Sequence, residues 1–165
     1  MANLAECVDI AVEDISALLK FAKSNAIDLT VVGPEIPLML GIVDEFKANG
    51  LKIFGPTKKA AQLEGSKVFT KNLFKKYNIP TADYQVFTDI DVARNYINEF
   101  MIAGKKLVIK VDGLAAGKGV VIATNKEEAH QAIDSMLLDK SFGDAGDRII
   151  IEEFLEGEEV SVFAI

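Results

Sequence analysis

The chain of 165 residues is half hydrophobic and about a quarter charged, a composition typical of an ordered protein with one ordinary domain or two small ones. Its formal net charge of −7 argues against non-specific binding to nucleic acid or to an anionic membrane, although a few local lysines can still bind a nucleotide. The single cysteine, Cys7, excludes an internal disulfide and fits a reducing compartment. No apolar run approaches the roughly 20 residues of a membrane-spanning helix. We therefore predict a soluble, cytoplasmic protein.

The first third of the sequence alternates short apolar runs with segments of helical periodicity. Asp14 can cap a helix, and apolar residues recur behind it at helical spacing as far as Ala22. Pro37 suits the first turn of a second helix. In chain order, we expect a strand at 7–10 that buries Cys7, a helix ending before Asn25, a buried strand at 29–33, a helix ending at Asn49 and Gly50, and a strand at 51–54. This alternation predicts a parallel α/β sheet with right-handed crossovers.

The pattern changes between about Phe54 and Glu64, and we expect a domain boundary there. Thr57 can cap a short helix that runs through Leu63, and Ser66 can cap the helix that follows. The remaining elements expected are a helix at 67–77, a strand at 84–87, a helix at 89–101, strands at 107–111 and 119–124, a helix at 126–138, a loop at 139–147, a strand at 148–154 and a final apolar strand at 160–165.

A lysine inside an apolar strand and a glycine-rich loop carry the clearest functional signal. Lys110 interrupts the predicted strand, and an ammonium there needs an anionic partner or a route to solvent. The loop from Gly113 to Gly119 could bring backbone N–H groups close to phosphate oxygens, with Lys118 adding a positive charge. The spacing differs from a P-loop, and a strand follows instead of a helix. The alternative is a β-hairpin with a mobile tip and a lysine that reaches solvent.

Two further segments could contact a ligand. In open parallel sheets, ligands bind beyond the carboxyl ends of the strands, which makes Gly33, Pro34 and Glu35 candidates; they could equally form only a turn. The predicted strand at 148–154 runs into an acidic cluster at 152–159. That cluster could be a solvated turn, or a hinge whose free backbone groups bind a purine edge.

Four motifs together resemble the ATP-grasp superfamily: Glu-Gly-Ser-Lys at 64–67, Val-Ile-Lys-Val-Asp-Gly at 108–113, Gly-Leu-Ala-Ala-Gly-Lys-Gly-Val at 113–120 and Glu-Glu-Phe-Leu-Glu-Gly-Glu-Glu at 152–159. A narrower likeness is to the phosphoribosylamine–glycine ligase family, through Val-Val-Gly-Pro-Glu at 31–35, Ile-Phe-Gly-Pro-Thr at 53–57, Ala-Gln-Leu-Glu-Gly-Ser-Lys at 61–67 and Phe-Gly-Asp-Ala-Gly at 142–146. The resemblance implies an α/β fold: part of a parallel-sheet, Rossmann-like N-terminal domain at 1–62, then the first part of an ATP-grasp domain at 63–165, with its lid subdomain at about 82–155.

The resemblance also implies which residues bind ATP. Lys67 and Lys110 would contact the phosphates, and the loop would cover them. Glu152 would meet the adenine amino group, Phe154 and Leu155 would offer backbone to the ring, and Glu159 would hold the ribose. The implied ATP-binding residues are Lys67, Lys110, Gly113, Leu114, Ala115, Ala116, Gly117, Lys118, Gly119, Val120, Glu152, Glu153, Phe154, Leu155 and Glu159.

By the same resemblance, the activity is an ATP- and Mg²⁺-dependent ligation of phosphoribosylamine with glycine in purine biosynthesis. The family's metal ligands and reaction centre would lie beyond Ile165, and its first strand before this chain, so we expect a truncated fragment that is inactive alone and holds no catalytic or metal-binding residue. Two alternatives stay open: another ATP-grasp ligase, such as a biotin-dependent carboxylase subunit, and a non-catalytic module that binds nucleotide or a partner protein. No nucleic-acid or membrane partner is expected.

Overall fold

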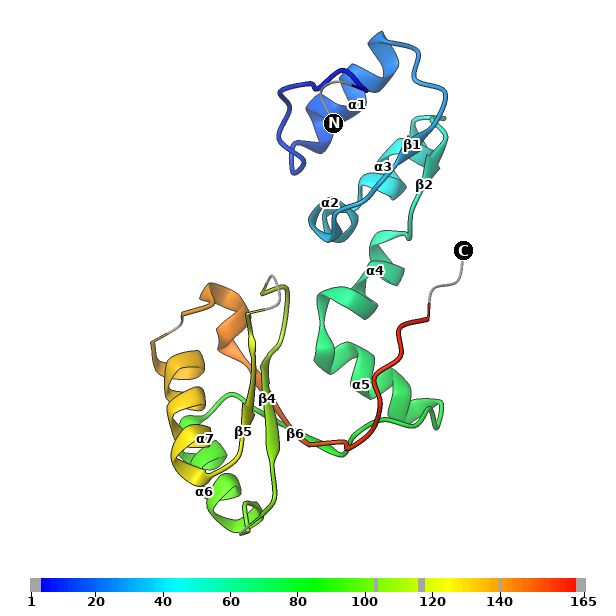
Figure 1. Cartoon of the computed structure of the whole chain (residues 1–165). Helices are drawn as coiled ribbons and strands as arrows, with labels where there is room; N and C mark the ends of the chain where they lie inside the picture. Colours follow the sequence, from blue (N-terminus) through cyan, green and yellow to red (C-terminus); the bar gives the residue numbers. More distant parts are fainter. Residues whose placement is uncertain (1–3, 103, 116–117, 140, 163–165) are drawn as a thin grey trace. The chain divides into compact units, whose positions relative to one another are not determined.

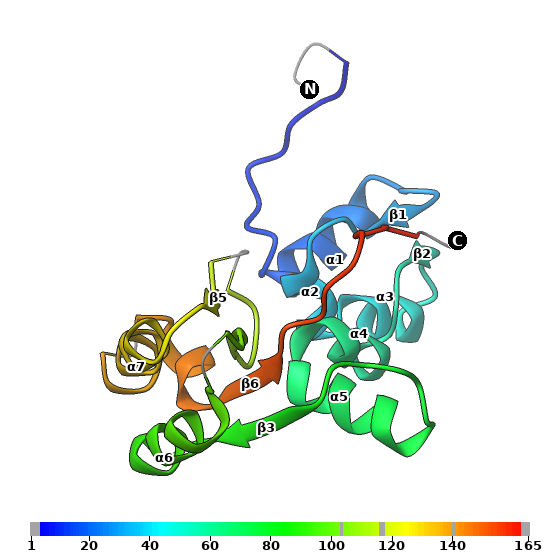
Figure 2. The ribbon, with the colours of Figure 1, turned by 60° about the horizontal axis from the view of Figure 1, so that its bottom comes forward.

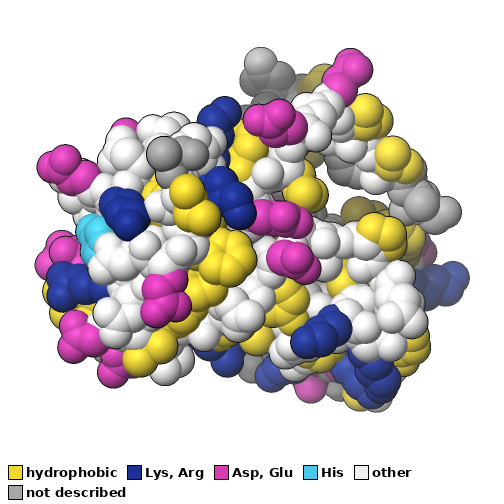
Figure 3. Space-filling model, turned by 90° about the horizontal axis from the view of Figure 1, so that it is seen from below, with side chains coloured by type: hydrophobic (Ala, Val, Ile, Leu, Met, Phe, Trp, Pro, Cys, Tyr) yellow, Lys and Arg dark blue, Asp and Glu magenta, His cyan; other side chains and the backbone are white. Residues whose placement is uncertain are grey.

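The protein divides into two compact units, Met1–Gly65 and Ser66–Ile165. The structure is a computed structural model and describes residues 4–102, 104–115, 118–139 and 141–162. None of its described helices is long and apolar enough to cross a membrane. In the space-filling view of Figure 3, acidic side chains are visible among the lysine and arginine side chains of the described residues.

The first unit is a small α/β arrangement around a two-stranded parallel sheet. Its elements are α1 (Ile15–Ser24), β1 (Thr30–Val31), α2 (Glu35–Leu40), α3 (Ile42–Ala48), β2 (Ile53–Phe54) and α4 (Lys58–Gly65). As predicted, Asp14 caps α1, because its side chain accepts a hydrogen bond from the Ala17 N–H at 2.9 Å. The parallel pairing of β1 with β2 confirms the parallel α/β arrangement expected from the sequence. Its core gathers Ala22, Ile42, Val43 and Phe46.

Three predictions for this unit are wrong, and the strand predicted at 51–54 is confirmed only over the two residues of β2. Residues 7–10 do not form a strand, and Cys7 is exposed, because this segment has no strand to pair with among the described residues; Figure 2 shows irregular chain before α1. The strand predicted at 29–33 is reduced to β1 and is not buried, since Leu29 and Val31 are more than half exposed. The single helix predicted with Pro37 in its first turn is broken in two at Gly41, whose φ of 96° lies in the left-handed region.

The second unit contains a four-stranded antiparallel sheet in the order β3-β6-β4-β5. Its elements are α5 (Lys67–Lys76), β3 (Tyr84–Phe87), α6 (Ile90–Phe100), β4 (Leu107–Val111), β5 (Val120–Ala123), α7 (Lys126–Ile133), a π-helical turn (Asp134–Leu138), a 3-10 turn (Gly143–Asp147) and β6 (Ile149–Glu153). Four predicted strands are therefore present. The strand predicted at 160–165 is not formed by its described residues, 160–162, which are irregular and exposed because no described strand pairs with them. The loop predicted at 139–147 contains the 3-10 turn.

One face of this sheet packs into a hydrophobic core, and the opposite face carries charged side chains. Helices α6 and α7 lie side by side against one face (Figures 1 and 2), where Ile109 and Ile151 pack with residues such as Ile97 and Ile133. Side chains alternate along a strand, so Lys110 and Glu152 point from the opposite face. The register places Lys110 across from Ile150 on β6 and from Val120 on β5. The sheet thus separates its packed core from a face that is free to hold polar groups.

Candidate nucleotide-binding site

A lysine and a glutamate from neighbouring strands form an ion pair on the charged face of the sheet. Lys110 Nζ donates to Glu152 Oε2 at 3.0 Å. The Lys110 side chain is 27% exposed and that of Glu152 only 5%, so the carboxylate is buried while the ammonium keeps access to solvent. The structure therefore brings together two residues predicted to bind ATP, and the ammonium inside the strand has an anionic partner.

A second lysine, which the sequence analysis did not select, contacts the same carboxylate. Lys71 on α5 is 8% exposed, and its Nζ lies 3.2 Å from Glu152 Oε2. The other oxygen of the carboxylate, Oε1, is also buried, yet it has no hydrogen-bond partner among the described residues. A buried acceptor without a donor is uncommon and costly, because it has lost its hydrogen bonds to water. Glu152 thus presents an unsatisfied acceptor on the charged face of the sheet.

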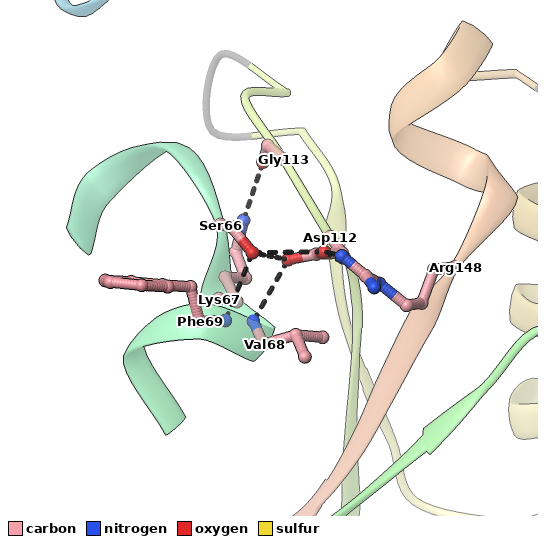
Figure 4. A network of polar contacts seen from close by, with 7 residues as sticks. All are labelled: Ser66, Lys67, Val68, Phe69, Asp112, Gly113 and Arg148. Carbon is pink, nitrogen blue, oxygen red and sulfur yellow. Dashed lines mark hydrogen bonds and ion pairs between the residues drawn. The ribbon is translucent and has the colours of Figure 1, made fainter. Parts of the chain in front are cut away.

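A second buried carboxylate, Asp112, fixes the start of the glycine-rich loop (Figure 4). Its oxygens accept hydrogen bonds from Ser66 Oγ at 3.1 and 3.2 Å and from the Val68 N–H at 3.0 Å. Arg148 also donates to Asp112, through Nε at 2.9 Å and through Nη2. Ser66 caps α5 as predicted, since Oγ accepts from the Phe69 N–H. Asp112 therefore ties the start of α5 and the start of β6 to the end of β4.

The hydrogen bonds around Asp112 also set its charge. Burial by itself raises the pKa of Asp112, because it disfavours the charged form. The hydrogen bonds from the Val68 N–H, Arg148 and Ser66, with the positive charge of Arg148, lower the pKa by more than burial raises it. The pKa of Asp112 therefore lies below its ordinary value, and the carboxylate is ionised at neutral pH.

Lys67 reaches the same region. Its Nζ donates to the carbonyl oxygen of Gly113 at 2.8 Å, so a lysine predicted to bind phosphate lies at the start of the predicted lid (Figure 4). A hydrogen bond from the Val111 N–H to the Gly119 carbonyl oxygen, at 3.0 Å, joins the two ends of the predicted lid at its base. Lys118 is exposed. Of the other predicted lid residues, Leu114 and Val120 are exposed and Ala115 is half-buried against the core, while Ala116 and Gly117 lie outside the described residues.

The residues of the predicted adenine hinge follow β6. Glu153 is exposed, and its carboxylate accepts a hydrogen bond from the Asp83 N–H at 3.1 Å, which ties this end of β6 to the chain before β3. The ring of Phe154 lies 4.9 Å from Lys106 Nζ. Leu155 and Glu159 are exposed in irregular chain. The described backbone after Glu153, residues 154–162, thus lies outside any helix or strand.

The predicted substrate residues belong to the other unit. Gly33 and Pro34 line an apolar groove of about 370 Å³ formed with residues of α1, β1 and α3. Glu35 is exposed and begins α2, for which Pro34 is the N-cap residue. The side chains that line the groove are mostly apolar, and none of the described lining residues is charged. The groove therefore offers a substrate no ionic partner.

The residues that the sequence analysis missed are Lys71, Asp112 and Arg148. Asp112 stood within a quoted motif but was given no role. Each is defined by a partner from a distant part of the chain: the Val68 N–H bonded to Asp112, for instance, lies 44 positions away. A local signal did exist for Asp112, since a carboxylate directly after a buried strand is costly unless it is paired. No comparable signal distinguished Lys71 from the other lysines of α5.

Comparison with known proteins identifies the family. The profile described as "Phosphoribosylglycinamide synthetase, ATP-grasp (A) domain" matches residues 65–165, and that of the N domain of the same synthetase matches residues 1–64. The chain belongs to the phosphoribosylglycinamide synthetase family. Phosphoribosylamine–glycine ligase from Yersinia pestis is 58% identical over 156 residues, which are 94% of this chain and 36% of the relative. The chain thus spans about a third of the length of such curated relatives.

Solved structures agree with this fold. A crystal structure of phosphoribosylamine–glycine ligase from Thermotoga maritima matches this chain with a TM-score of 0.61 and 35% identity. The match covers 78% of this chain and 30% of the Thermotoga chain. The biotin carboxylase domain of 2-oxoglutarate carboxylase from Hydrogenobacter thermophilus, solved with MgADP, matches with a TM-score of 0.71 over 91% of this chain and 34% of that one. At 17% identity, the second likeness shows the fold alone. The fold class expected from the sequence is therefore confirmed.

Proposed function

We propose that this chain is the part of a phosphoribosylamine–glycine ligase that binds the adenine ring and the phosphates of ATP. The observation that carries the proposal is the buried Glu152 carboxylate beside Lys110. One of its oxygens has no donor among the described residues, and it lies on the sheet that bears the glycine-rich loop. An unsatisfied acceptor suits the amino group of adenine, and a partly exposed ammonium suits a phosphate. Family membership supports the same assignment.

The other predicted residues take their roles around this pair. Lys67 and the loop from Gly113 to Val120 would cover the phosphates, because glycines admit close approach of backbone N–H groups. Lys67 already lies at the start of the loop through its bond to Gly113. In this proposal the backbone of Phe154 and Leu155 borders the adenine ring, Glu159 binds the ribose, and Gly33, Pro34 and Glu35 contact the second substrate.

The proposed reaction is the formation of glycinamide ribonucleotide, ADP and phosphate in purine biosynthesis. A glycine carboxylate is a poor electrophile until ATP transfers its terminal phosphoryl group to it. The amine of phosphoribosylamine then attacks the carbonyl carbon of the glycyl phosphate, and phosphate leaves. The lysines of this chain would orient the phosphates and offset their charge. Mg²⁺ would add to that charge neutralisation, but no cluster of three or more His, Cys, Asp or Glu side chains among the described residues could hold a metal ion.

The test is calorimetric titration of Mg-ATP into the folded chain. A charged hydrogen bond contributes about 1.5–3 kcal/mol, so Lys110→Ala should weaken ATP binding by about tenfold to over a hundredfold. Lys126→Ala is the matched control, because this exposed lysine lies on α7, which packs on the other face of the sheet. Equal affinity in Lys110→Ala and the wild-type chain would contradict the proposal.

The isolated chain should bind nucleotide without completing the ligation. It spans about a third of its curated relatives, and its described residues contain no group that could hold the metal. An assay of ADP release with glycine and phosphoribosylamine tests this, and turnover by the chain alone would overturn it. In such an assay the chain would behave as a non-catalytic nucleotide-binding module.

A further inference from the structure

Lys71 is a buried lysine whose donors are all occupied. Besides Glu152 Oε2 at 3.2 Å, its Nζ contacts Thr81 Oγ1 at 2.7 Å and the Ala82 carbonyl oxygen at 3.1 Å. An ammonium has three N–H groups, so these three acceptors satisfy it. The contacts with Thr81 and Ala82 come from the segment just before β3. Lys71 is therefore held in place by more than its ion pair with Glu152.

Lys71 and Lys110 contact the same oxygen of Glu152 but differ in their freedom to move. The Lys110 side chain is 27% exposed and contacts only Glu152 among the described polar groups. The Lys71 side chain is 10% exposed and has its two additional acceptors. If Lys110 turns to a phosphate, Lys71 stays with Glu152 and keeps its charge compensated. A buried carboxylate left without a partner would be strongly destabilised.

Both lysines bind Oε2, which leaves Oε1 as the oxygen for a ligand. A carboxylate oxygen can only accept, so the ligand must supply an N–H or O–H group. Adenine carries an amino group at position 6, whereas hypoxanthine and guanine carry an oxygen there. A 6-oxo purine would bring two acceptors together with no proton between them. The arrangement therefore favours a 6-amino purine.

We infer that Lys71 is a positioning residue that holds Oε2 of Glu152, directs Oε1 at the nucleobase and so makes the site select a 6-amino over a 6-oxo purine nucleotide. This rests on the proposed function, in which the charged face of the sheet binds ATP. Lys71 does not touch the nucleotide. Its effect on specificity passes through the orientation of Glu152, and removing its charge should change the choice of base more than the affinity for phosphate.

The experiment compares ATP with inosine triphosphate, which differs at position 6 of the base, by calorimetric titration into the 165-residue chain. The wild-type chain should prefer ATP by about tenfold or more, because a polar group left unpaired in a site built for hydrogen bonding strongly rejects the wrong ligand. Lys71→Met should reduce this preference to within about threefold by weakening ATP alone. Lys71→Arg should restore much of it, and Lys75→Met, an exposed lysine on the same helix, should behave as wild type.

A second variant covers the case in which Lys71→Met does not fold. Thr81→Val removes one acceptor of Lys71 with little change of shape, and it should lower the preference for ATP part of the way. An unchanged preference in either folded variant, or an equal loss for both nucleotides, would overturn the role of Lys71. A wild-type chain that binds both nucleotides equally would overturn the base selection. A folded wild-type chain that binds neither would instead refute the proposed function, and the role of Lys71 with it.

Discussion

Asp112 shows how a single buried side chain holds the predicted site together. Its carboxylate accepts hydrogen bonds from the start of α5 and from Arg148 just before β6, while its own residue begins the loop that would cover the phosphates (Figure 4). Its backbone N–H also donates to the Arg148 carbonyl oxygen at 2.9 Å. Because the Asp112 side chain is only 4% exposed, loss of its charge would leave several buried donors poorly satisfied.

Asp112→Asn should therefore destabilise the second unit at neutral pH, by about 1–3 kcal/mol. The amide keeps the size of the side chain but loses the charge and one acceptor. Urea unfolding at pH 7 measures the change. The control is Asp139→Asn, which alters an exposed carboxylate and should leave the free energy of unfolding nearly the same. Equal stability of both variants would show that the carboxylate contributes nothing beyond its shape.

The same residue predicts a dependence of stability on pH. The folded-state pKa of Asp112 is lowered, so the unfolded chain takes up its proton at a higher pH than the folded chain does. Its contribution is fully present above the unfolded value of about 4 and is lost as the pH falls through the lower folded value. The difference in unfolding free energy between wild type and Asp112→Asn should shrink as the pH falls from about 4 through the lower folded pKa. A constant difference over that range would contradict the assignment.

At the scale of the elements, the base of the lid depends on a close approach between strands. The Val111 N–H donates to the Gly119 carbonyl oxygen, and this brings β4 and the start of β5 together. A Cβ at Gly119 would lie 2.4 Å from Val111 Cγ2 and 2.6 Å from Ala115 Cβ. The site thus has no room for a side chain, and its glycine is needed for space.

Gly119→Ala should force the lid base apart and cost about 1–3 kcal/mol of unfolding free energy, as overpacked sites do. Gly157→Ala is the control, because a Cβ there meets nothing within 4 Å. Chemical denaturation of the two variants beside wild type measures the cost. The prediction fails if Gly119→Ala is as stable as the control.

At the scale of the whole molecule, the two units have separate hydrophobic cores. Phe46 and Val43 belong to the core of the first unit, while Ile109 and Ile151 belong to that of the second. A large buried side chain replaced by alanine loses burial and leaves a cavity. Each core should therefore govern the stability of its own unit.

Ile109→Ala should destabilise the second unit by about 2–5 kcal/mol, and Phe46→Ala the first unit by about 3–5 kcal/mol. Native-state hydrogen exchange resolves the two units: Ile109→Ala should speed exchange in β4 and β6 but not in α3, and Phe46→Ala the reverse. Ile122→Ala, at an exposed position on β5, is the control. Faster exchange throughout the chain from either core variant would mean that the units unfold as one.

Local signals predicted much of the second unit. Ser66 caps α5 as predicted, because its side chain can satisfy an N–H group a few residues ahead without help from distant segments. The strand at 84–87 and the lysine strand at 107–111 have the predicted bounds, since each segment is mostly apolar and is followed by a polar residue. In the first unit, the apolar runs at 7–10 and 29–33 did not form the predicted strands. The first run has no described strand to pair with, and the second is not buried.

The sequence by itself determined the family, the fold class and the motifs of the predicted ATP site, because these depend on residue types at fixed spacings. Only the tertiary structure decided which of those residues meet. It joined Lys110 to Glu152, brought Lys71 to the same carboxylate and left Oε1 without a donor among the residues that the structure describes. Ion pairs between distant segments depend on strand register and on the packing of α5, and neither is encoded in any one stretch of the chain.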